Sequence, residues 1–320
     1  MKKLLLTAGL ALLTPLAIAK GAADFPSKPI RIVVPFTAGS GSDTGARVYG
    51  EILSRFLGQP VVVENKPGGS GLIAIQTVKA AEPDGHTIML ASNSPMTVNT
   101  VVFKKLAYDP VKEFRPVSGL GRGPLAFVVN ADSPYKTIHD LAEAARTGKR
   151  SLTVGNYSAG YHLVAAWFGT VTGAEVTHVP YKGGAQMMND LIGGQLDTGA
   201  IDFGGALPLI KEGRLRALAI TSGERHPDFP DVPTMKESGF PEFETYVWTS
   251  LFVRAETPDD ITEKLADAMQ KVLETDEAKA YQATIPSTVM RFGPDQMRKF
   301  QLAEIERFRS VAKAAGIDPQ

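Results

Sequence analysis

The sequence predicts an α/β protein of two domains, and three observations support that prediction. Short β-branched runs alternate with amphipathic stretches through most of the 320 residues, a pattern typical of parallel sheets with helical crossovers. A unit of strand, glycine-bearing turn and helix occurs near residue 30 and again near residue 151. The chain contains no cysteine, so packed layers and not disulfides must stabilise the fold.

The first half of the chain is expected to contain three strands joined by two helices. The strands correspond to the runs "IRIVVPF", "PVVVEN" and "HTIMLAS". One helix opens at Asp43 and Thr44, and the other begins near Leu72. Residues 103–124 lack periodicity and contain three prolines, so we expect an irregular segment that leads to a crossing between domains.

The second half repeats this alternation through Thr221. Residues 223–246 are rich in proline and charge and predict a loop with one short helix, followed by the strand "VWTSLFV". From Thr257 onward the pattern is helical, without strands. With crossings near Pro124 and Trp248, domain 1 comprises residues 24–124 plus 249–320, and domain 2 comprises residues 125–248. A single doubly wound domain is the alternative arrangement.

The N-terminus has the three parts of a secretory signal peptide. Two lysines precede an apolar run that is too short to span a bilayer, and small residues follow it. We assign residues 1–23 to this peptide, with cleavage after Ala19 or Ala23. A membrane anchor is the alternative, but the polar stretch "GAADFPSKP" follows without a stop-transfer pattern. The mature chain is therefore expected in the periplasm.

The charge balance and the histidine spacing exclude several kinds of site. Thirty-four basic residues balance 34 acidic ones, so no basic excess predicts a nucleic-acid partner. The histidines lack the spacing of common zinc motifs, and cysteine ligands are absent. The sequence thus predicts neither a metal site nor a cofactor.

The stretch "PFTAGSGSDTGAR" raises the question of what its glycine turn holds. Its glycines at 39, 41 and 45 are spaced one residue too widely for a dinucleotide fingerprint, although Glu64 imitates the ribose-binding acid. Asp43 at the helix start would also repel a pyrophosphate. The dinucleotide interpretation is therefore the weaker one.

A serine hydrolase is the enzyme alternative. Ser158 lies in "NYSAG" between a strand and a helix, and Asp202 and His226 follow in the order of the α/β-hydrolase triad. However, Asn156 replaces the first glycine of the nucleophile elbow.

The third interpretation treats the two glycine turns as a pair that binds a carboxylate. Each turn places backbone N–H groups of a helix start at the carboxyl edge of a sheet. Two domains that each present such a turn form a cleft that closes on a small anion without any lysine or arginine.

Several motifs together resemble one family. The segments "QPVVVENKPGGSG", "EPDGHTIMLAS", "VPYKGGAQMMNDLIGGQLD" and "RALAITSGERHPDFPDVPTMKESGFPEFETYVW" follow the glycine turn in family order and spacing. They closely resemble the extracytoplasmic solute-binding proteins of tripartite tricarboxylate transporters, the Bug family. The resemblance implies a two-domain type II periplasmic-binding-protein fold, or Venus flytrap, with a ligand cleft between domains. It further implies no catalysis, a monomer, and delivery of a small organic acid to membrane permease subunits.

The resemblance also implies the ligand-binding residues. These are expected in the first loop, in the second loop, and at two further positions lining the cleft: Phe36, Gly39, Ser40, Gly41, Ser42, Asp43, Asn156, Tyr157, Ser158, Ala159, Gly160, His162, Tyr181 and Asp202. Asn93 is a lesser candidate from its position alone, because it lies just past the third strand at the same sheet edge. We expect Asp43 to be the N-cap of its helix, while Ser40, Ser42 and Ser158 either cap helices or donate to the ligand.

The second loop departs from the family pattern. It is shorter than usual and contains an aromatic residue, Tyr157. The ligand class therefore stays open among dicarboxylates, tricarboxylates and aromatic carboxylates, with the aromatic residue favouring a flat acid.

Overall fold

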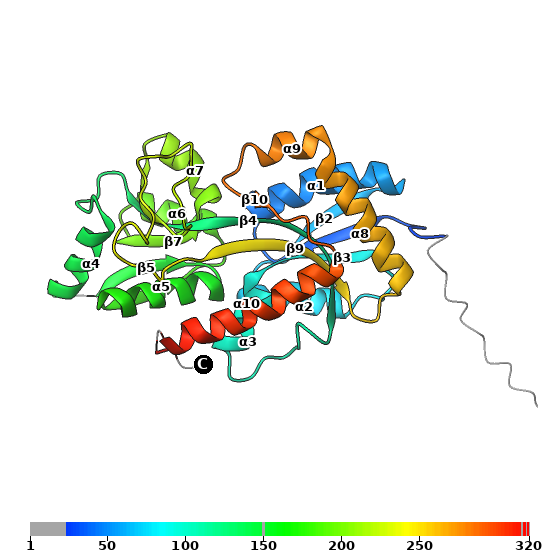
Figure 1. Cartoon of the computed structure of the whole chain (residues 1–320), viewed down its shortest axis with the longest axis horizontal. Helices are drawn as coiled ribbons and strands as arrows, with labels where there is room; N and C mark the ends of the chain where they lie inside the picture. Colours follow the sequence, from blue (N-terminus) through cyan, green and yellow to red (C-terminus); the bar gives the residue numbers. More distant parts are fainter. Residues whose placement is uncertain (1–23, 149–150, 315, 318, 320) are drawn as a thin grey trace, which may run out of the picture.

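The computed structural model describes residues 24–148, 151–314, 316, 317 and 319. The predicted signal peptide, residues 1–23, lies outside the described residues. Figure 1 shows two lobes, with two long strands running across the middle. None of the described helices is long and apolar enough to cross a membrane.

The first lobe is built on a parallel arrangement of three strands. Strand β1 pairs in parallel with both β2 and β3, as the strand–helix alternation predicted. The strands are β1 (Ile30–Val34), β2 (Val61–Asn65) and β3 (Thr87–Ser92), and the helices between and after them are α1 (Gly41–Leu57), η1 (Gly69–Gly71), α2 (Leu72–Lys79), η2 (Ser94–Val98) and α3 (Asn99–Val102). The two short helices η2 and α3 were not predicted from the sequence.

The second lobe repeats this design. Strand β5 pairs in parallel with β6 and β7, and helices follow each of these strands. Its elements are α4 (Ile138–Thr147), β5 (Leu152–Asn156), α5 (Ala159–Thr172), β6 (Val176–Pro180), α6 (Gly184–Ile192), β7 (Thr198–Asp202), α7 (Phe203–Lys211) and β8 (Leu215–Ile220). The short helix predicted within residues 223–246 is wrong: this segment contains turns and bends. Ser238 N–H donates to Thr234 C=O in a single helical turn, which ends at Gly239 with φ +86°.

Two antiparallel strands connect the lobes. Strand β4 (Phe114–Asn130) pairs with β9 (Tyr246–Arg254) as far as Pro124↔Tyr246, and from Leu125 onward it pairs with β7 and β8. The expectation of an irregular segment is wrong for residues 114–124. Register shifts between Pro116 and Ser118 and between Gly119 and Gly121 let the strand accommodate its proline and glycines. The domain boundaries given above remain a prediction.

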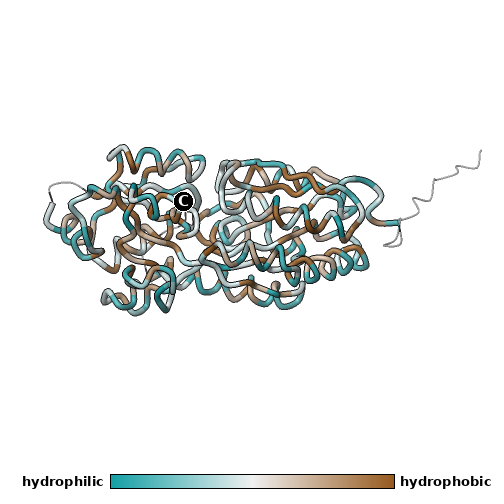
Figure 2. The backbone as a smooth tube through the Cα atoms, turned by 90° about the horizontal axis from the view of Figure 1, so that it is seen from above, coloured by the Kyte–Doolittle hydropathy of each residue, from teal (hydrophilic) through white to brown (hydrophobic). Residues whose placement is uncertain are grey.

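Alternate side chains of each strand point to opposite faces of the sheet, and helices cover both faces. In β1, Ile30, Ile32 and Val34 pack in the core with α1 and α8, whereas Val33 packs in the core with α2 and α10. In β4, Leu125, Phe127 and Val129 pack toward α4 and α5, and the residues between them pack toward α6 and α7. This period of two produces three layers in each lobe. Figure 2 shows apolar segments running through the interior of the lobes.

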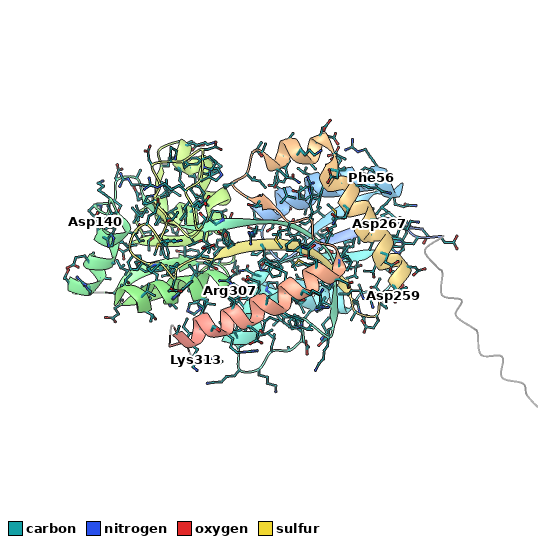
Figure 3. The ribbon with its side chains drawn as sticks, in the orientation of Figure 1. Phe56, Asp140, Asp259, Asp267, Arg307 and Lys313 are labelled. Carbon is teal, nitrogen blue, oxygen red and sulfur yellow. The ribbon has the colours of Figure 1, made fainter. Side chains whose placement is uncertain are left out.

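The C-terminal segment returns to the first lobe, as predicted, and adds one short strand that was not. It comprises α8 (Asp259–Glu274), α9 (Asp276–Gln282), β10 (Thr288–Val289) and α10 (Pro294–Ala314). Helix α10 runs beneath the crossing strands, and Arg307 lies near the middle of the molecule, between the ends marked by Asp140 and Phe56 (Figure 3). The Arg307 guanidinium donates to Thr245 Oγ1 over 3.2 Å.

One apolar cluster joins the lobes on the side of α10. Val98 and Val101 of the first lobe, Leu163 of α5, and Phe308 and Ala312 of α10 are buried together. We call this group the inter-lobe cluster. It holds the head of α5 against the first lobe.

Two glycines with left-handed backbones provide a matched test of packing. Gly85 has φ +80°, and a Cβ there would lie 2.4 Å from Ile261 Cγ2 of α8. Gly58 has φ +69° but no heavy atom within 4 Å of the same position. We expect Gly58→Ala to lower the free energy of unfolding by about 1–2 kcal/mol through backbone strain alone. Gly85→Ala should suffer the same loss from strain and a further loss of about 1–3 kcal/mol, because its Cβ would crowd Ile261. Denaturant unfolding measures both, and equal losses would contradict tight packing of α8 on this turn.

Candidate functional site

The two predicted loops line two cavities in the cleft between the lobes. The larger cavity has a volume of about 360 Å³, and residues of α1, α7, α9 and the crossing strands line it. The smaller cavity, of about 270 Å³, lies at the head of α5 and is also lined by η1 and by Val102 and Phe103 after α3. Tyr157 lines both cavities. The side chain that departs from the family pattern therefore forms the wall between them.

The first loop turns β1 into α1 at the edge of the larger cavity. Ser40 is the N-cap of α1, and its hydroxyl oxygen accepts from Asp43 N–H over 3.2 Å. Phe36, Gly39, Ser40, Gly41 and Ser42 all line the larger cavity, and their contact with a ligand stays a prediction. The loop thus presents the start of a 17-residue helix to the cleft.

The prediction that Asp43 is the N-cap is wrong, because it lies three residues further into the helix. Its carboxylate is buried and accepts hydrogen bonds from Gly39 N–H, Arg47 and Asn65. Burial opposes ionisation, but these hydrogen bonds together hold the pKa of Asp43 below its usual value. Asp43 therefore fixes the shape of the first loop from inside the lobe, and it is not among the residues lining the two cavities.

The second loop turns β5 into α5 at the smaller cavity. Asn156, Tyr157, Ser158 and Ala159 line it, together with His162 from the first turn of α5. Ser158 occupies the N-cap position without a capping side-chain bond. The Nδ2 atom of Asn156 is buried and has no hydrogen-bond partner among the described residues.

Ser94 of the first lobe binds the second loop directly. Its hydroxyl lies 3.0 Å from Ser158 Oγ and accepts from Gly160 N–H over 3.1 Å. A Cβ on Gly160 would lie 2.8 Å from Ser94 Oγ and 3.3 Å from Asn93 Nδ2. Asn93 and Gly160 therefore lie at the contact between the lobes, behind the cavity walls, and Gly160 allows that contact to be close.

Asp202 lies at the end of β7 and faces the larger cavity. Its Oδ2 accepts from Gly205 N–H over 2.8 Å and so caps α7. Its Oδ1 accepts from the hydroxyls of Tyr157 and, over 3.3 Å, Tyr161. Burial first, and then the charge of Asp202, raise the pKa of both tyrosines well above the usual value, so both remain protonated donors.

Further aromatic side chains surround this carboxylate. The ring of Phe36 meets the ring of Tyr157 edge-on at 6.2 Å, and Tyr157 lies 4.4 Å from Tyr161. Tyr49 of α1 and Tyr281 of α9 also line the larger cavity. Tyr161 belongs to the second loop that the sequence located, whereas the sequence gave no signal for Tyr281.

Two histidines pack together beside the smaller cavity. The imidazoles of His162 and His178 lie 4.0 Å apart, and His178 Nδ1 is buried without a partner among the described residues. Burial lowers the pKa of His162, and burial together with the neighbouring imidazole lowers the pKa of His178 to about 4. Tyr181 also lines this cavity and donates to Asp190 Oδ2 over 2.8 Å.

The hydrolase triad is not assembled. Ser158 bonds Ser94, Asp202 bonds the two tyrosines and Gly205, and the ring nitrogen of His226 accepts from Asp228 N–H. No hydrogen bond among the described residues joins Ser158, Asp202 and His226. The part of the chain that the structure describes also has no group of three or more histidine, aspartate or glutamate side chains that could hold a metal ion.

The histidine pair predicts a pH dependence of stability. Between about pH 6.5 and pH 4 the unfolded chain binds a proton at His178 more readily than the folded chain does, so the free energy of unfolding falls as the pH drops through this window. Thermal unfolding should show a flatter dependence for His178→Gln than for the native protein. The exposed His139→Gln is the control, and parallel curves for all three proteins would contradict the prediction.

Comparisons with known proteins agree with this geometry. A family model described as the tripartite tricarboxylate transporter family receptor matches residues 46–317. Protein BugT of Bordetella pertussis is 33% identical over 320 residues, covering 99% of this chain and 98% of its own length.

Two solved structures of similar proteins share the fold. The periplasmic binding protein BugD has a TM-score of 0.87 at 30% identity, covering 92% of this chain and 100% of its own. The R. palustris protein Rpa4515, solved with adipate, has a TM-score of 0.88 at 34% identity, covering 93% of this chain and 100% of its own. The chain therefore belongs to the tripartite tricarboxylate transporter receptor family and, like the members of that family, is a solute-binding receptor rather than an enzyme.

Proposed function

We propose that this receptor captures a small carboxylate-bearing solute in the cleft, through backbone amides of the two glycine-containing loops. Family membership and the relative solved with adipate, a dicarboxylate, support the carboxylate class. Both loops line the cleft at the start of a helix, where the first N–H groups lack partners within the helix.

The two helix starts that face the cleft carry the proposal. The start of α5 lies at the smaller cavity. Its described lining contains no aspartate or glutamate, and Ala159, the first residue of the 14-residue α5, lies at its wall. The unpaired Asn156 Nδ2 adds a buried donor beside that helix start. A carboxylate would satisfy these donors and interact favourably with the positive end of the helix dipole.

The expected contacts are strong enough for useful affinity without a cationic side chain. Hydrogen bonds to a charged group contribute about 1.5–3 kcal/mol each, and a helix start contributes about 0.3–1 kcal/mol. Three or four such contacts reach the roughly 8 kcal/mol that a micromolar dissociation constant requires.

Delivery is the second part of the proposal. We infer that the mature receptor, exported by its signal peptide, carries its solute in the periplasm to the permease subunits of a tripartite transporter as a monomer. The family description and the periplasmic relative BugD support this role. The domain boundaries at 124/125 and 248/249 belong to the same proposal, as the places where the lobes rotate about the crossing strands.

A ligand screen tests the carboxylate proposal. The protein is first partly unfolded and refolded to remove co-purified solute, and its thermal stability is then measured with aliphatic and aromatic acids. A bound acid should raise the free energy of unfolding by about 2.7 kcal/mol at a hundredfold excess over its dissociation constant. NAD and acyl esters are the controls. Stabilisation by a control alone would contradict the proposal.

An isosteric variant tests the smaller cavity. Asn156→Asp replaces the unpaired donor with a negative charge, so it should weaken the binding of the stabilising acid at least tenfold. Asn189→Asp, on an exposed position of α6, adds the same charge outside the cleft and should leave binding unchanged. Equal affinity of both variants, measured by calorimetry, would place the carboxylate elsewhere.

A further inference from the structure

The smaller cavity has an apolar end. Four of its lining side chains also pack in or against the inter-lobe cluster, namely those of Val102, Phe103, Leu163 and Ile317. Its other end is polar, because the start of α5 lies there together with Asn156 Nδ2, which has no hydrogen-bond partner among the described residues. The cavity therefore offers one surface to a charged group and another to a hydrocarbon chain.

The first turn of α5 separates these two ends. Ala159 begins the helix, and Leu163 follows four residues later on the same face, about 6 Å further along the helix axis. Both residues line the smaller cavity. A carboxylate bound at the start of α5 would therefore direct its chain past Leu163, toward Phe103 and Ile317.

A Schellman motif at the end of α10 holds Ile317 at this wall. Ile317 N–H donates to Ala312 C=O over 2.9 Å, and Gly316 N–H donates to Lys313 C=O over 3.2 Å, which are the two hydrogen bonds of that motif. Gly316 has φ +63°, the left-handed backbone that the motif requires. Helix α10 ends next to α3 and α5 (Figure 1), so the side chain of Ile317 packs between the lobes, against the cluster that includes Ala312.

We propose that Ile317 is a specificity-determining residue, which closes the apolar end of the smaller cavity and so sets the longest hydrocarbon chain that a bound acid can carry. This inference rests on the proposed function, which places a carboxylate at the start of α5. The solute is then an organic acid whose chain buries apolar surface against Leu163, Phe103 and Ile317. A second carboxylate at this end would be buried among apolar side chains at a high desolvation cost.

Straight-chain acids of increasing length test this limit. Calorimetry measures the dissociation constant of each mono-acid from butanoate to decanoate, and of the matching di-acids, with protein freed of co-purified solute. The affinity of the native protein for mono-acids should rise about fourfold with each methylene that becomes buried, and it should stop rising at the chain that meets Ile317. Ile317→Ala removes most of the end wall, so this limit should move to a longer acid by at least one methylene.

Matched variants separate the end wall from general stability. Gly316→Val strains the left-handed backbone of the Schellman motif without touching the cavity, so it should move the limit in the same direction as Ile317→Ala. Gly213→Val introduces the same strain after α7, where the glycine has φ +68° and equally open surroundings, and should leave the limit unchanged. Val171→Ala removes an exposed apolar side chain of α5 outside both cavities and should also leave it unchanged. Melting curves confirm that each variant is folded.

The possible results separate the two proposals. If Ile317→Ala keeps the native limit, or if Gly213→Val moves it as far as Gly316→Val does, Ile317 does not set the chain length and the inference is overturned. If di-acids bind and no mono-acid does, the apolar end does not receive the chain, and the carboxylate receptor stands without this inference. If no acid of either kind binds, both proposals fail.

Discussion

The pairing of β4 with β9 is the interaction on which the rest of the structure depends. These strands are the two crossings between the lobes, and β4 exchanges β9 for β7 and β8 between Pro124 and Leu125. The same ladder forms part of the cleft, because Gly121, Gly123 and Thr249 line the larger cavity. A rotation of one lobe against the other must bend this ladder, and it therefore changes the width of the cleft directly.

The two cavities of the cleft are lined by neutral polar groups far more than by charged ones. Neither cavity has a lysine or arginine in its described lining, and the polar atoms are amides, hydroxyls, one imidazole and one carboxylate. Neutral donors in a partly enclosed site cost less to desolvate than a guanidinium, and the backbone holds them in fixed positions. On the proposed function, such a site would select a ligand by its shape and by the placement of its hydrogen-bonding groups.

The sequence predicted the strands, helices and turns whose conformation depends on residues close together in the chain. β-branched runs, helical stripes and glycine turns located the three-strand units of both lobes and the two loops at their edges. The first eleven residues of β4 were missed, because Pro116 and the glycines at 119, 121 and 123 oppose a strand locally. Pairing with β9, more than a hundred residues further along the chain, overrides that preference and places the bulges.

The same limit applies to the site. The loop residues were predictable from the turns, but Tyr281 reaches the cleft only through the topology, which brings α9 from the C-terminal segment over the larger cavity. Asp43 illustrates the reverse error. An acidic residue near a helix start is often an N-cap, yet the capping hydroxyl of Ser40 three residues earlier left Asp43 free to bind Arg47 and Asn65.

The inter-lobe cluster gives the cleft an asymmetric geometry. Because Leu163 and Phe308 hold the lobes together on the side of α10, displacement during a rotation increases with distance from that side. The opposite rim is formed by α7 and by the segment after α9, where Gly204 faces Pro286 (Figure 1). A rotation about the crossing strands would therefore widen the cleft most at that rim and least beside α10.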